Sequence, residues 1–126
     1  MVNDLVTEAH AITTAMDIHE LVARLNSHLG ATAVAALANV RDSKLPYRWA
    51  KADGPTPNAQ ARERLQAAHR AWLVLADAES DHVARSWFLG ANPLLDEEAP
   101  ILVLRSGRIR EVLQASEAFA KGTWHG

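Results

Sequence analysis

Apolar residues in this chain recur at the spacing of an α-helix, and this periodicity limits the fold more than any other feature. The clearest stretch covers residues 58–79, whose apolar side chains follow at intervals of three or four: Ala61, Leu65, Ala68, Trp72 and Leu75. Such a spacing places side chains on one face of a helix. No segment alternates with a period of two for long enough to predict a strand, and residues 101–104 are the only short rival. We therefore predict an all-α protein with about seven or eight helices and no internal repeat.

Capping and turn residues divide this helical pattern into segments. Asp17, Asn58 and Ser80 are typical N-caps, and each precedes an apolar stripe. Ser43 is expected to cap a short helix that ends near residue 53, and Gly90 is expected to end another helix in the left-handed conformation. Trp49, Trp72 and Trp87 lie on the apolar stripes of their own helices, which predicts that all three are core residues.

Length and composition favour a small globular protein. The chain has 126 residues, of which 48% are hydrophobic and 22% charged, and its net charge is −2. It contains no Cys and no 18-residue apolar run, and its first residues do not resemble a signal peptide, so we expect a cytoplasmic protein without membrane contact. The six His residues show no metal-ligand spacing, and no nucleophile or phosphate-binding motif occurs. We expect no metal, no cofactor and no catalytic residue.

Residues 31–54 resemble a helix-turn-helix. Small residues stand where two short helices would cross, and Asn39 lies nearest to the position where a turn glycine is usual. Residues 41–53 contain four bases and two acids, so this segment carries a local charge of +2 in a protein of net charge −2. The predicted DNA-binding residues are Arg41, Lys44, Tyr47, Arg48 and Lys51. One such motif is a small footprint, so we expect a homodimer reading half-sites about 34 Å apart. The alternative interpretation is a helical hairpin with a solvated basic face.

Residues 78–113 contain a second arrangement of turn residues. An Ala-Trp helix is followed by an Asn-Pro-x-Leu turn, a Pro-led short helix that ends near a Gly, and a final helix; the residues are Ala84, Trp87, Phe88, Asn92, Pro93, Leu95, Pro100, Leu104, Gly107 and Val112. In this order they resemble the C-terminal toxin-binding domain of the Xre/MbcA/ParS-type antitoxins. That family places a helix-turn-helix before this domain, so the resemblance covers roughly residues 30–121.

The resemblance implies a function and a partner. Its members typically bind a RES-domain toxin that consumes NAD, and they commonly repress their own operon by binding operator DNA. We therefore divide the chain into residues 1–79, an N-terminal helix and the helix-turn-helix DNA-binding region, and residues 80–126, the antitoxin-like toxin-binding domain. The predicted partner-binding residues are Phe88, Asn92, Leu94, Leu95, Trp124 and His125, of which the last two would reach into the toxin from the C-terminal end. The apolar residues crowding the turn either pack under the core or form a docking patch.

Two other functions fit the same sequence. The chain could be a stand-alone DNA-binding transcriptional regulator that uses the C-terminal region for dimerisation only. It could also be an interaction protein whose basic face never meets DNA. A RES-type gene beside the gene of this chain would favour the antitoxin.

Overall fold

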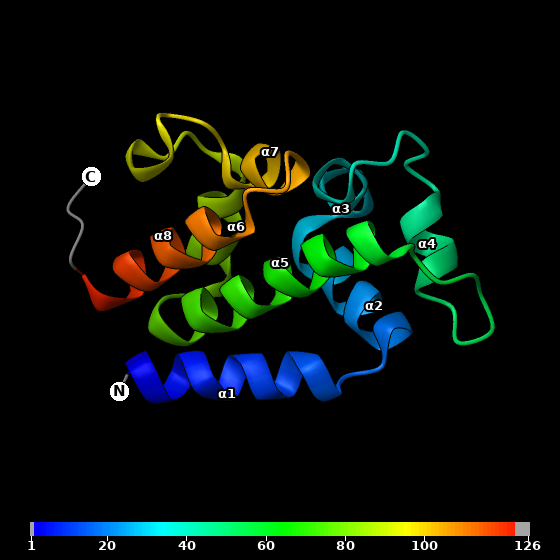
Figure 1. Cartoon of the computed structure of the whole chain (residues 1–126), viewed down its shortest axis with the longest axis horizontal. Helices are drawn as coiled ribbons and strands as arrows, with labels where there is room; N and C mark the ends of the chain where they lie inside the picture. Colours follow the sequence, from blue (N-terminus) through cyan, green and yellow to red (C-terminus); the bar gives the residue numbers. More distant parts are fainter. Residues whose placement is uncertain (1, 123–126) are drawn as a thin grey trace.

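The computed structural model describes residues 2–122 and contains eight α-helices and one short 3-10 helix in that part of the chain (Figure 1). The elements are α1 (Val2–Ala15), α2 (Ile18–Leu29), α3 (Ala31–Ala38), α4 (Leu45–Trp49), α5 (Ala59–Ala78), α6 (Asp81–Leu89), η1 (Pro93–Leu95), α7 (Pro100–Arg105) and α8 (Ile109–Lys121). No strand occurs between residues 2 and 122. The all-α prediction is confirmed.

The predicted N-caps start their helices as expected. The side chains of Asp17, Asn58 and Ser80 accept the backbone N–H of the residue three positions later, at 3.2, 2.8 and 3.2 Å. Each bond satisfies one of the N–H groups that a helix leaves unpaired at its start.

Helix α5 is the central element of the fold. Helices α1 and α8 run along it, and α2, α3 and α6 also pack against it (Figure 1). The buried apolar residues form one hydrophobic cluster that extends from Ile18 to Ala115. The cluster contains residues from both sides of the predicted boundary between residues 79 and 80, so the two predicted functional regions share one core.

Three of the four Trp side chains are buried in this core, as predicted. Trp49 and Trp72 are each 3% exposed and Trp87 is 8% exposed. Trp72 lies between two rings, since it stacks on His28 at 4.1 Å between centroids and on Phe88 at 6.4 Å. Trp124 lies outside the described residues.

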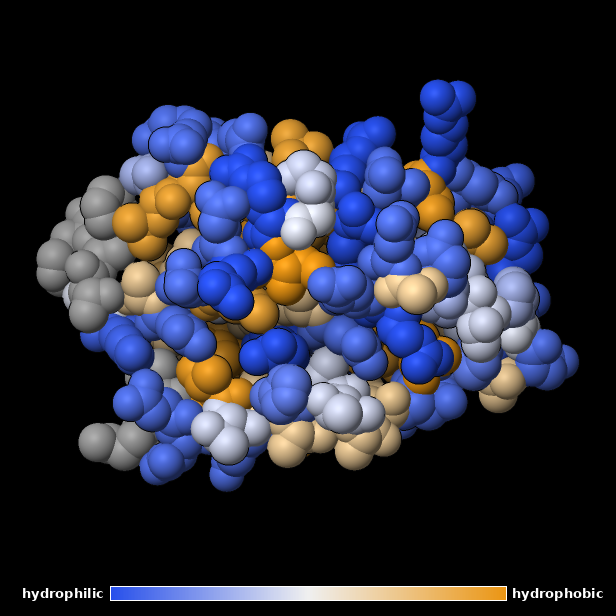
Figure 2. All heavy atoms as spheres, viewed as in Figure 1, coloured by the Kyte–Doolittle hydropathy of each residue, from blue (hydrophilic) through white to orange (hydrophobic). Residues whose placement is uncertain are grey.

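The apolar side chains of α1 are buried to different degrees. Ala9 and Thr13 are buried against α5, whereas Ile12 is 47% exposed. Figure 2 shows apolar side chains interspersed with hydrophilic ones over one face of the molecule. Within residues 2–122, no helix has the length and apolar character needed to cross a membrane.

Candidate nucleic-acid and partner interfaces

The structure presents all five predicted DNA-binding side chains to solvent. Arg41, Lys44, Tyr47, Arg48 and Lys51 are exposed, and Tyr47 reaches 60%. Between them Pro46 and Trp49 are buried. The segment therefore packs its apolar side against the rest of the protein and exposes its basic side to solvent.

Helix α4 is shorter than the sequence suggested. It has five residues and ends at Trp49, not near residue 53, so Lys44 precedes it and Lys51 follows it. The chain after α4 folds back closely: a Cβ at Gly54 would lie 2.0 Å from the Arg48 carbonyl oxygen. Gly54 is therefore required where the chain turns back. Lys44, Arg48 and Lys51 do not share one continuous helix.

Two side chains of α2 hold α4 in place. His19 Nδ1 lies 2.7 Å from the Trp49 carbonyl oxygen, and Asn26 Nδ2 donates to the Pro46 carbonyl oxygen at 3.0 Å. The bond from His19 pairs the carbonyl of the last residue of α4, and the bond from Asn26 adds a second donor to the Pro46 carbonyl, which also accepts the Ala50 N–H. The basic segment is thus fixed on α2 although α4 is short.

Asp42, rather than Ser43, organises the start of α4. Its Oδ1 accepts the Lys44 backbone N–H at 2.9 Å, and its Oδ2 lies 2.6 Å from Arg48 Nη2. The bond from Lys44, followed by the neighbouring Arg48 guanidinium, lowers the pKa of the Asp42 carboxyl. Arg48 is therefore already paired with an acid, which weakens it as a phosphate ligand.

In the second predicted site, three of the four partner-binding residues that the structure describes are buried. Phe88 and Leu95 are 0% and 2% exposed and belong to the hydrophobic core, which favours core packing over a docking patch for these two residues. Asn92 is also buried, and its Oδ1 accepts the Leu94 backbone N–H at 2.9 Å. Leu94 is the exception at 43% exposed. Trp124 and His125 lie outside the described residues.

Left-handed residues form the turn at unexpected positions. Gly90 is extended, with φ −95° and ψ 162°, which corrects the expectation of a left-handed cap there. Instead Asp96 and Glu97 have φ values of 54° and 66°. The Glu97 backbone N–H donates to the Asn92 carbonyl oxygen at 2.9 Å, and the Asn92 N–H donates to that of Glu98 at 3.2 Å. Asn92 thus closes the turn through its backbone and its side chain.

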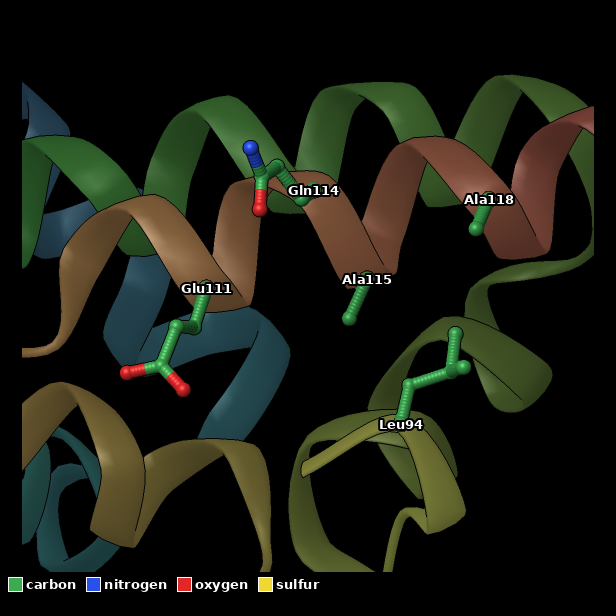
Figure 3. Close-up of a pocket in the computed structure, with 5 residues that line it drawn as sticks. All are labelled: Leu94, Glu111, Gln114, Ala115 and Ala118. Atoms are coloured by element: carbon green, nitrogen blue, oxygen red, sulfur yellow. The ribbon is translucent and has the colours of Figure 1, made fainter. Parts of the chain in front are cut away.

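A cleft of about 350 Å³ lies between this turn and α8, lined by Leu94, Glu111, Gln114, Ala115 and Ala118 (Figure 3). Leu94 extends from the turn toward Ala115 and Ala118 on the opposite wall. The small alanines leave room above α8 for an apolar group. Glu111 and Gln114 add polar groups to the same lining.

Arg108 connects the turn to α8 at one side of this cleft. Its guanidinium lies 2.7 Å from Glu98 and 2.7 Å from Glu111. These contacts raise the pKa of Arg108 and lower that of Glu111, chiefly through their hydrogen bond. Arg108 was not predicted as a site residue, although its position close in sequence to the acids of residues 96–98 indicates an ion pair.

The comparisons with known proteins add no family to this geometry. No family model, no curated protein and no solved structure matches the chain. Among the described residues, no three or more His, Cys, Asp or Glu side chains form a group that could hold a metal ion.

Proposed function

We propose that this chain is an antitoxin-like protein of the cytoplasm that binds and neutralises a RES-domain toxin and represses its own operon through DNA binding. The residue order of positions 78–113 supports this, because it resembles the toxin-binding domain of Xre/MbcA/ParS-type antitoxins. The single observation that carries the partner-binding part is the exposed Leu94 beside the cleft on α8.

Leu94 is suited to act as an anchor for a partner. It stands on a turn that Asn92 closes by four hydrogen bonds and that Arg108 ties to α8. A side chain presented by such a fixed turn loses little conformational freedom on binding, which favours affinity. In the proposed complex the toxin covers Leu94 and places an apolar group between Leu94 and Ala115.

The exposed basic segment supports the DNA-binding part of the proposal. Lys44, Tyr47 and Lys51 project from a support that is fixed on α2. Cations on one exposed surface attract the phosphate backbone of DNA. Because α4 is short, we assign these residues to phosphate contacts and place the protein on DNA as a homodimer.

A stand-alone transcriptional regulator is the second candidate function. The burial of Phe88 and Leu95 favours it, since the partner surface is smaller than the sequence suggested. In that case the C-terminal region would serve dimerisation only. A RES-type gene beside the gene of this chain separates the two candidates.

Co-purification with the neighbouring RES-type gene product tests the proposal. The tagged chain is compared with Leu94→Asp and with Leu102→Asp, a matched control because Leu102 is 48% exposed on α7 and does not line the cleft. We expect the toxin to co-purify with the wild type and with Leu102→Asp but to be lost with Leu94→Asp. Equal capture by all three proteins would remove the cleft from the proposal, and no capture by the wild type would contradict the antitoxin function.

A further inference from the structure

Arg105 at the end of α7 connects the C-terminal region to the turn before the basic segment. Its Nε donates to the Oδ1 of Asn39 at 3.2 Å. Asn39 closes α3 in the left-handed conformation, with φ 62° and ψ 45°, and α3 and α7 lie side by side (Figure 1). Arg105 therefore contacts Asn39, the residue that ends α3 and begins the turn leading to Arg41.

We infer that Arg105 is part of the DNA-binding surface and contacts a phosphate of the same duplex as Lys44 and Lys51. This inference rests on the proposed DNA-binding function. It extends that surface beyond residues 41–51, across the α3–α4 turn and onto α7. The C-terminal region would thus contribute a DNA contact as well as a partner site.

Distance supports the inclusion of Arg105. Arg41 follows Asn39 by two residues, so their Cα atoms are at most ~7 Å apart. Arg105 is hydrogen-bonded to Asn39 and consequently lies at the edge of the basic segment. Duplex DNA carries one negative charge per ~1.7 Å of its axis, so a cation held at Asn39 and the nearby Arg41 can meet phosphates of the same stretch of duplex.

The charges around Arg105 also support the inference. Arg48 is neutralised by Asp42, which leaves Arg41, Lys44 and Lys51 as the main cations of the segment. Arg105 is exposed and takes part in none of the ion pairs within residues 2–122. Its Nε is used by Asn39, while its two Nη groups make no hydrogen bond in that part of the chain. A guanidinium held in this way can present both Nη groups to one phosphate.

Salt-dependent DNA binding tests the inference directly. Fluorescence anisotropy is measured over a range of salt with a labelled duplex of about three helical turns (~30 bp) taken from upstream of the gene. For Arg105→Ala the log–log salt slope should fall by about 0.9, as expected for one lost phosphate contact. Arg105→Lys keeps the charge and should retain the slope. Lys121→Ala is the control, because this exposed base is the last residue of α8, and that end of α8 lies at the opposite end of the molecule from α4 (Figure 1).

The outcomes separate this inference from the proposed function. If Lys44→Ala lowers the slope while Arg105→Ala, with an unchanged melting temperature, does not, Arg105 is outside the interface and the DNA-binding function stands. If the wild type does not bind the duplex at all, both are overturned. If Arg105→Ala loses stability, the uncharged variant Arg105→Gln, whose amide can still donate to Asn39, decides: an unchanged salt slope in the folded Gln variant would overturn the inference.

Discussion

The Oγ1 atom of Thr13 on α1 and the Nδ1 atom of His69 on α5 lie 2.7 Å apart in the interface between these helices, and both side chains are buried. Burial, with smaller effects of Arg24 and His28, lowers the pKa of His69 to about 4, and Glu20 opposes this shift. His69 is therefore neutral at pH 7 and joins α1 to the central helix.

This bond predicts a pH dependence of stability. In the unfolded chain the pKa of His69 is near 6.5, whereas in the folded protein it is about 4. Between these pH values the unfolded chain binds a proton at His69 that the folded protein does not bind. Stability should therefore be constant above pH 6.5 and fall as the pH drops toward 4, by up to about 3 kcal/mol. Urea denaturation at several pH values measures this. His69→Gln should flatten the curve, whereas the exposed control His82→Gln should not; an unchanged slope in His69→Gln would contradict the assignment.

The left-handed turn predicts a stabilising substitution. Glu97 has φ 66°, a conformation that is costly for residues with a Cβ and favourable for Gly. Glu97→Gly should stabilise the protein by about 0.5–1 kcal/mol and raise Tm by a few degrees. The neighbouring Glu98→Gly is the control and should lower Tm, because Glu98 is not left-handed and pairs with Arg108. A lower Tm for Glu97→Gly would show that its side chain has another role.

The buried Trp72 predicts a large stability loss on truncation. Its ring is 3% exposed and stacks on His28. Trp72→Ala should reduce the free energy of unfolding by about 3–5 kcal/mol. Leu102→Ala, at an exposed position of α7, should change it by less than about 0.5 kcal/mol. Equal denaturation midpoints for the two variants would exclude Trp72 from the core.

Local signals in the sequence identified much of the fold. Asn58 and Ser80 start helices because their side chains pair with a backbone N–H three residues later, an interaction that needs no distant partner. The helical spacing around Trp72 gave the buried face of α5 for the same reason. These features depend on neighbours in the chain and could be read without the structure.

The parts that sequence reasoning missed depend on distant contacts. Phe88 and Leu95 follow no regular period, so only the packing of the turn on α5 and α8 decides that they are buried. Helix α4 ends early because the chain returns to the Arg48 carbonyl group at Gly54. Arg105 was not identified, because its partner Asn39 is 66 residues away in the chain.

The Asp42–Arg48 pair predicts a gain in DNA binding on removal of an acid. Asp42→Asn keeps an acceptor for the Lys44 N–H but releases Arg48 from its ion pair. We expect tighter binding and a salt slope steeper by up to about 0.9. Asp53→Asn makes the same charge change at an exposed residue of the segment that forms no ion pair within residues 2–122. Anisotropy titrations that show equal gains for both variants would mean that freeing Arg48 adds no phosphate contact.

NAD consumption by the neighbouring RES-domain toxin tests the central claim most directly. The purified toxin is titrated with the full chain, with Leu94→Asp and with a chain that ends at Gly122, which keeps the residue that caps α8. We predict that the full chain stops NAD consumption at a stoichiometric ratio, that Leu94→Asp requires a large excess, and that removal of Trp124 and His125 weakens inhibition without unfolding the protein. A Trp anchor commonly carries about 2 kcal/mol or more of binding, which corresponds to roughly thirtyfold in affinity. NAD consumption that continues unchanged in excess full chain would contradict the antitoxin function.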